Sequence, residues 1–208
     1  MGTLSQKKPS SRLYEIPPTT KRLFVVGDLH GDRISYDTVV NSWRSEKDSS
    51  IIFLGDYADR GPHGLEVIEA LMKLSKEDGV VVLKGNHEDY FDSGQPDFSP
   101  CHLISEVTEK RGSWDSYFSQ CLKPFFDGLY ISAVLPGKIL FIHGGISTRI
   151  ENIDSLMYPT PETERDRGRE RRLSALCPKA MQGNKLPKLC GTPFSTKGVA
   201  RRHYHALR

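Results

Sequence analysis

Four short polar clusters carry the side chains of this sequence that could do chemistry. They read GDLHGD at 27–32, GDYADRG at 55–61, GNHE at 85–88 and HGG at 143–145. The potential metal ligands in them are carboxylates, imidazoles and one amide, and no cysteine belongs to the set. Oxygen and imidazole donors of this kind suit manganese, iron or zinc better than a structural zinc site made only of thiolates.

The donors in these clusters are too many for a single ion. They are Asp28, His30, Asp56, Asp59, Asn86, His87 and His143. Crowding so many polar groups together is costly unless something satisfies them, and a pair of metal ions would do so. Asp56 lies between the other clusters and is the natural bridging carboxylate. Two ions about 3.5–4 Å apart can activate a shared water and clamp the oxygens of an in-line phosphoryl displacement.

Apolar runs stand in front of the clusters and predict the strands that must position them. The first three runs are residues 22–26, 51–54 and 80–83. Between them, apolar residues recur with helical spacing at 36–43 and 65–72. Alternating strands and helices predict right-handed βαβ units and a largely parallel sheet. Ligands bind beyond the carboxyl ends of such strands, so the first three clusters should converge on one rim.

The rest of the chain is less regular. We expect a loop over 89–101, an aromatic-rich helix over 114–126, and a β-hairpin that joins 129–135 to 138–142 and ends at His143. No regular element is predicted over 165–195, and only weak helix potential follows it. The resulting division is a flexible leader at 1–20, a catalytic core at 21–161, and a basic, poorly ordered or divergent segment at 162–208.

Charge is distributed unevenly over the 208 residues, whose net charge is +3. Residues 161–208 contain 12 Lys+Arg and 4 Asp+Glu, so the remainder is net acidic. We interpret the basic end as a solvated tail and do not expect nucleic acid as a partner, although the tail's charge keeps that alternative open.

Membrane insertion and export are not expected. Mean hydropathy is −0.46, and no apolar run reaches the roughly 18 residues of a membrane helix. The first residues lack the apolar core of a secretory signal. The four cysteines form no CxxC pair, so we expect reduced thiols in a cytoplasmic protein.

In their order and context, the four clusters resemble the motifs of the calcineurin-like metallophosphoesterases. The forms GDYADRG and GNHE resemble the serine/threonine protein phosphatase branch of that superfamily. The resemblance covers roughly Arg22 to Pro161. It implies an α/β/β/α sandwich with a parallel-rich sheet, two divalent or trivalent metal ions (manganese, iron or zinc) and a phosphoprotein or phosphopeptide as substrate.

The resemblance also implies roles for individual residues. Asp28 and His30 would bind the first ion, Asn86 and His143 the second, and Asp56 both. His87 would be the general acid that protonates the leaving alkoxide, with Asp59 orienting its imidazole. Arg60 would bind the substrate phosphate, assisted by Asn86. These roles agree with general chemistry, because a serine alkoxide needs a proton donor and a guanidinium matches a phosphate.

The C-terminal end departs from the family pattern. A further histidine completes the family's second metal shell, whereas the late histidines here are His203 and His205, with no apolar strand to carry them. We therefore expect a weakly bound second ion and a second sheet whose C-terminal strands are incomplete. The absence of acidic residues after Glu170 fits a shortened or frame-shifted chain, or a divergent tail.

Three functions stay open at this point. The leading one is a dinuclear-metal phosphomonoesterase that hydrolyses phosphoserine and phosphothreonine in proteins by direct attack of a metal-activated water. The same chemistry would serve hydrolysis of dinucleoside polyphosphates or other small phosphoesters. The third is a weakly active or inactive phosphatase-like binding protein, for which the missing histidine is the reason.

Overall fold

The first sheet carries three of the four polar clusters. The computed structural model describes residues 11–146 and 150–164, together with the backbone of 204–207. The strands of this sheet are β2 (Arg22–Val26), β3 (Ser49–Phe53), β4 (Val80–Val82) and β7 (Tyr204–Leu207), in the order β4-β3-β2-β7. β2, β3 and β4 are parallel, as predicted, and helices α1 (Arg33–Arg44) and α2 (Gly64–Leu74) connect them.

Both faces of β2, β3 and β4 are largely buried, which explains why the sequences of these strands are mostly apolar. Ile51 and Phe53 point toward the helices and pack with α1 and α2. Ile52 and Leu54 point the other way and pack against Phe141 of the second sheet. Alternate side chains of one strand therefore fill two separate cores.

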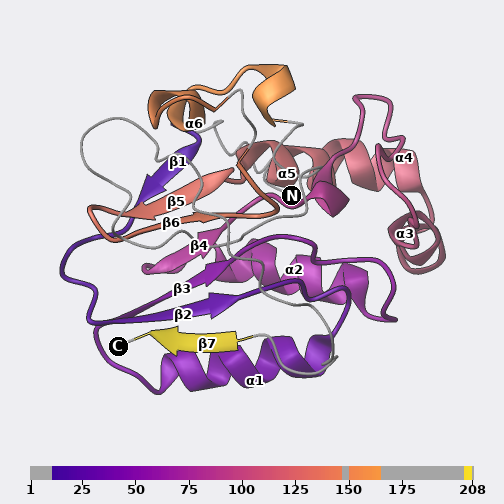
Figure 1. Cartoon of the computed structure of the whole chain (residues 1–208). Coiled ribbons are helices and arrows are strands. Elements are labelled where there is room, and N and C mark those ends of the chain that lie inside the picture. Colours follow the sequence, from indigo (N-terminus) through magenta and orange to yellow (C-terminus); the bar gives the residue numbers. More distant parts are fainter. Residues whose placement is uncertain (1–10, 147–149, 165–203, 208) are drawn as a thin grey trace, which may run out of the picture.

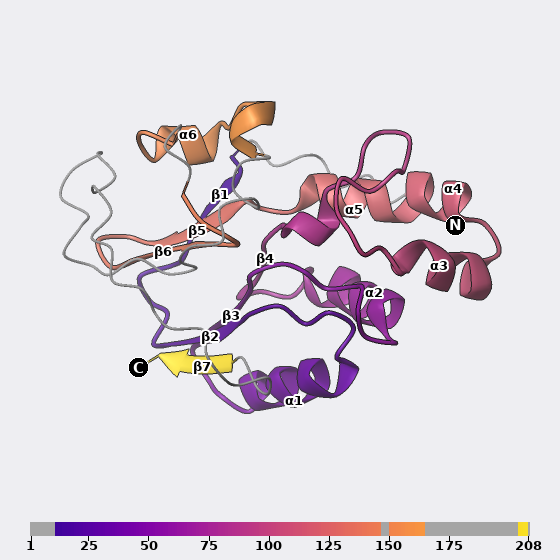
Figure 2. The ribbon, with the colours of Figure 1, turned by 45° about the vertical axis from the view of Figure 1, so that its right-hand side comes forward.

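The second sheet supplies the fourth cluster. Its strands are β1 (Leu13–Glu15), β5 (Ser132–Leu135) and β6 (Ile139–Ile142), in the order β1-β5-β6. β5 and β6 form the predicted antiparallel hairpin. Its outer face packs against α6 (Asp154–Met157) through Leu156. The layers are thus helix, sheet, sheet and helix, the α/β/β/α sandwich that was expected (Figures 1 and 2).

A third group of helices lies at the side of the sheets in both views (Figures 1 and 2). It consists of α3 (Leu103–Arg111), α4 (Trp114–Tyr117), the π turn η2 (Phe118–Leu122) and α5 (Lys123–Gly128). The helix predicted over 114–126 is therefore confirmed. Its aromatic rings pack on Tyr90 within the core, so they are packing residues.

Two predictions about the chain ends are wrong. Leu13 and Ile16, placed in a flexible leader at 1–20, are 4% and 1% exposed, and β1 pairs in parallel with β5. At the other end, Tyr204–Leu207 is a strand instead of weak helix, and it pairs antiparallel with β2. His205 therefore lies in a strand, contrary to the expectation. His203 and the remainder of 165–203 lie outside the described residues.

The structure also bears on the predictions about the cysteines and about membrane insertion. Cys101 and Cys121, the cysteines in the described part of the chain, are free thiols. None of the helices within the described ranges is both long and apolar enough to cross a membrane.

Candidate metal centre

The predicted ligands meet at one rim between the two sheets. Asp28, Asp56 and Asn86 follow β2, β3 and β4, whose carboxyl ends share an edge, and η1 (Asn86–Glu88) forms a short 3-10 turn there. His143 follows β6 and reaches the same place from the second sheet. Its Nε2 lies 3.1 Å from the Asn86 Oδ1.

Asp56 is the common member of two possible ligand groups. One group is His30, Asp56 and His87, and the other is Asp28, Asp56 and His143. The ligand atoms within each group lie within 4.8 Å of one another. The two carboxylate oxygens of Asp56 face different histidines, at 3.6 Å from the Nε2 of His30 and 3.4 Å from the Nε2 of His143. One buried carboxylate thus stands between two sets of donors.

These groups divide the ligands differently from the family pattern. Asp28 falls in the group of His143, although its Oδ2 is also 3.9 Å from the His30 Nε2. His87, expected to be an acid, falls in the group of His30. The structure therefore brings the predicted ligands together and places His87 beside two of them.

The histidine tautomers fit metal ligation. The Nδ1 of His30 lies 2.9 Å from the Ala58 carbonyl, and the Nδ1 of His143 lies 3.1 Å from the Leu54 carbonyl. Because a carbonyl only accepts, both Nδ1 atoms donate a hydrogen, and in the neutral imidazole of His30 this leaves the lone pair on Nε2, facing the site. The His30 Nε2 is buried without a hydrogen-bond partner. An unsatisfied buried acceptor beside a carboxylate is what a bound cation would complete.

Two glycines let the loops that carry Asp56 and Asn86 approach each other. At Gly55, whose φ is +122°, a Cβ would lie 2.5 Å from the backbone of Gly85. At Gly85, a Cβ would lie 2.4 Å from the Asp56 backbone nitrogen and from its carboxylate. No side chain fits at either position without moving a ligand.

Glu88, which the sequence analysis did not select, ties these loops together. Its buried carboxylate accepts backbone N–H groups from Gly85 at 2.8 Å and from Asp56 and Tyr57 at 3.0 Å each. Burial and the charge of Asp56 raise the pKa of Glu88 to about 8, against the effect of the three N–H donors. Its place within GNHE, next to a ligand, was the signal that could have identified it.

His87 and Asp59 form a buried pair at the edge of the site. The His87 Nδ1 lies 2.7 Å from the Asp59 Oδ2, with the side chains 1% and 0% exposed. Burial opposes the charged imidazole, but the hydrogen bond to Asp59 and the nearby carboxylates outweigh it and raise the pKa of His87. Burial also disfavours the ionised form of Asp59, yet the hydrogen bonds from His87 and from backbone N–H groups lower the pKa of Asp59.

The backbone at the rim is strained. Four non-glycine residues there have positive φ angles, namely His30 (45°), Asp56 (59°), Asp59 (69°) and Arg60 (64°). Such conformations are costly and persist only where the surroundings enforce them, as they do at functional sites. All four residues had been selected from the sequence, Arg60 through the family resemblance.

Arg60 and Phe98 border the site. The Arg60 side chain is exposed and forms no ion pair with any residue in the described part of the chain. Phe98, in the loop over 89–101, places its ring 4.5 Å from that of His87. Nothing in the local sequence marked Phe98, because the loop returns to His87 only in three dimensions.

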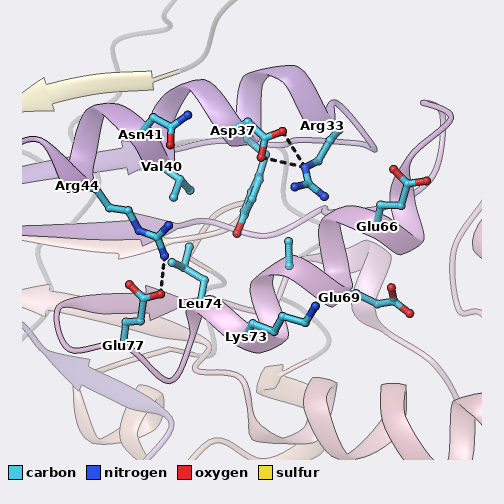
Figure 3. A pocket seen from close by; sticks show the side chains of 12 residues that line it. Arg33, Asp37, Val40, Asn41, Arg44, Glu66, Glu69, Lys73, Leu74 and Glu77 are labelled. Carbon is cyan, nitrogen blue, oxygen red and sulfur yellow. Dashed lines mark hydrogen bonds and ion pairs between the residues drawn. The ribbon is translucent and has the colours of Figure 1, made fainter.

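A hollow lies between α1 and α2 (Figure 3). It encloses about 340 Å³ and is lined by charged side chains. Its carboxylates pair with basic side chains, as Asp37 with Arg33 and Glu77 with Arg44 (Figure 3). With no histidine in its lining and its carboxylates facing cations, it offers no site for a metal.

Comparison with known proteins agrees with this geometry. Residues 21–188 match the family model described as calcineurin-like phosphoesterase. The catalytic subunit of serine/threonine-protein phosphatase 6 from Caenorhabditis elegans is 30% identical over 144 residues, which is 68% of this chain and 41% of that protein. Two further curated relatives from this nematode are covered over 38% and 28% of their length. The chain thus spans less than half the length of the curated relatives it matches.

Solved structures share the fold. A protein serine/threonine phosphatase from Saccharomyces cerevisiae has a TM-score of 0.52 and 23% identity, over 83% of this chain and 52% of that one. A cold-active protein-tyrosine phosphatase of a Shewanella species has a TM-score of 0.53 and 19% identity, over 72% and 48%. Phosphatases of two substrate classes therefore share this architecture, and the fold alone does not set the substrate.

Proposed function

Because the chain belongs to the calcineurin-like phosphoesterase family, we propose that it is a dinuclear-metal phosphomonoesterase that hydrolyses phosphoserine and phosphothreonine in proteins. The observation that carries this proposal is the pair of ligand groups that share the buried Asp56 carboxylate. The similarity to the nematode phosphatase 6 catalytic subunit supports proteins as the substrate class.

Five residues would hold the two ions: Asp28, His30, Asp56, Asn86 and His143. When bound, such a pair supplies Lewis-acid polarisation of the phosphoryl oxygens and activation of the attacking water. The protein contributes fixed donors, since backbone carbonyls orient His30 and His143 and the Glu88 carboxylate anchors the loop of Asp56.

The leaving oxygen of the substrate needs a proton. Water forms the new P–O bond as the bond to the serine or threonine oxygen breaks, and that oxygen takes a proton. His87 can supply it from Nε2, since its Nδ1 is held by Asp59 at 2.7 Å. The raised pKa of His87 keeps a larger fraction of the imidazole protonated near neutral pH, which suits a general acid.

The substrate phosphate needs a cation that the protein has not already neutralised. Arg60 follows Asp59 directly, and its exposed guanidinium has no carboxylate partner among the described residues. A guanidinium can bind two phosphate oxygens at once. In this proposal Arg60 binds the phosphoryl group beside the metals, and the Asn86 amide assists.

Metal analysis combined with turnover of an aryl phosphate tests the proposal. We expect up to two ions per chain and turnover that depends on added Mn²⁺. Phosphoserine and phosphotyrosine peptides and a dinucleoside polyphosphate then compete as substrates, and we expect the phosphoserine peptide to be hydrolysed fastest. Preference for the dinucleotide would assign the chain to small phosphoesters. Fewer than one ion per chain without Mn²⁺-dependent turnover would identify a phosphatase-like binding protein.

A further inference from the structure

His102, at the start of α3, contacts the turn that presents Arg60. The His102 Nδ1 accepts the backbone N–H of Arg60 at 3.1 Å. We propose that His102 is a positioning residue, which fixes the backbone at Arg60 in the conformation from which its guanidinium binds the substrate phosphate. This inference rests on the proposed function, because it takes Arg60 as the phosphate-binding residue.

The turn needs support because it is strained. Asp59 and Arg60 both have positive φ angles, 69° and 64°, and neither is a glycine. Two consecutive residues rarely adopt the left-handed region unless neighbouring groups enforce it. Left unsupported, the backbone would relax and move the Arg60 side chain away from the rim.

Support comes from α3 in two directions. The Asp59 Oδ1 accepts the backbone N–H groups of His102 at 2.6 Å and of Leu103 at 2.9 Å. In return, the His102 ring accepts the N–H of Arg60, so the turn and the helix start hold each other. The Asp59 contacts come from the main chain of α3, whereas the Arg60 contact comes from the His102 side chain.

The start of α3 is itself firmly placed. Glu106, one turn into the helix, accepts N–H groups from Gly64 at 3.3 Å and from Leu65 at 3.0 Å, at the start of α2. Leu103 and Val107 are fully buried. The backbone at His102 is therefore held in place, so its ring can restrain the turn at Arg60.

This division of contacts makes a side-chain substitution selective. Replacing His102 removes the acceptor for Arg60 and leaves both N–H donors to Asp59, and thus the His87–Asp59 pair, in place. Asparagine keeps an acceptor, because its Oδ1 can take the position of the imidazole Nδ1. Phenylalanine keeps a ring and has no acceptor. Substrate binding and the chemical step should therefore separate in these variants.

The test measures kcat and KM for an aryl phosphate with Mn²⁺, inhibition by inorganic phosphate, and bound metal. For His102→Ala and His102→Phe we expect KM and the phosphate inhibition constant to rise roughly 2- to 10-fold, as for one lost hydrogen bond, with kcat and metal content unchanged. His102→Asn should restore both constants. The matched control is His63→Ala, another exposed histidine just before a helix, which pairs with Glu66 and has no hydrogen bond to Asp59 or Arg60 in the described part of the chain.

Several outcomes would overturn the inference. It is wrong if His102→Ala and His102→Phe keep the parental KM and phosphate inhibition constant, or if kcat falls while KM is unchanged. It is also wrong if His63→Ala has the same effect. Should one variant not fold, the comparison of the other with His102→Asn decides. A parental protein without Mn²⁺-dependent turnover would instead refute the proposed function, and the inference with it.

Discussion

The metal-centre rim and the hollow between α1 and α2 are both rich in charged side chains, but they differ in how those charges are satisfied. In the hollow, Arg44 and Glu77 are exposed and pair with each other. At the rim, Asp56 is 5% exposed and faces a buried His30 Nε2 that has no hydrogen-bond partner. A buried ligand atom without a hydrogen-bond partner therefore indicates a cation site better than the number of charged side chains does.

The two regions also differ in their backbones. The hollow is formed by two regular helices, whereas the rim contains non-glycine residues with positive φ, among them Asp56 and Arg60. Strain at the rim is maintained by buried hydrogen bonds, above all those to Glu88. Substitutions at the rim should therefore abolish function, and those in the hollow should change stability slightly.

The largest effect is expected for Asp56→Asn. An amide cannot serve two ions as a carboxylate does, so we expect loss of bound metal and a fall in turnover of more than about 100-fold, beyond the 10–100-fold typical of residues that only support ligands. Elemental analysis and the aryl phosphate assay measure both. Asp37→Asn removes a carboxylate from the hollow and is the matched control. Retention of both ions by Asp56→Asn would contradict the shared-ligand assignment.

His87→Asn is expected to lower kcat about 10²- to 10⁴-fold, the usual contribution of a general acid. The ions should remain bound, because His87 acts on the leaving oxygen. Metal content and kcat are measured on the same preparation. Loss of both ions would instead make His87 a ligand in the group of His30 and Asp56, where the geometry also places it.

Asp59→Asn should shift the pH dependence of kcat. Turnover requires protonated His87, so the rate falls as pH rises through the pKa of His87. Asp59 helps to raise that pKa, and without its charge the alkaline limb should move to lower pH. The pH profile of kcat with Mn²⁺ measures the shift. An unmoved limb would show that another group limits the rate at high pH.

The smallest effect is expected in the hollow. Arg44→Ala removes an exposed ion pair with Glu77, and such pairs contribute about 0–1 kcal/mol. Urea unfolding at low and high salt should show a small loss of stability that salt diminishes. Turnover should equal that of the parental chain. A fall in kcat with unchanged metal content would mean that the conformation of the hollow is coupled to that of the rim.

Long apolar runs made much of the fold predictable from sequence. β2 occupies the predicted residues 22–26, because four consecutive apolar residues before a glycine have few alternatives. β1 (Leu-Tyr-Glu) and β7 (Tyr-His-Ala-Leu) were missed because neither contains a continuous apolar run. They form through distant partners, as when Leu13 pairs with Ser132. Pairing over such separations is not encoded in any short window of sequence.

The sequence by itself determined the chemistry of the candidate site. Residue types, their order and their positions after apolar runs selected Asp56 and His143 as ligands before any contact was known. Only the tertiary structure decided which atoms meet: the tautomers set by backbone carbonyls, the Glu88 carboxylate that joins two loops, and the His102 ring behind Arg60. Donor identity is a local property of the chain, whereas positioning depends on hydrogen bonds between segments that only folding brings together.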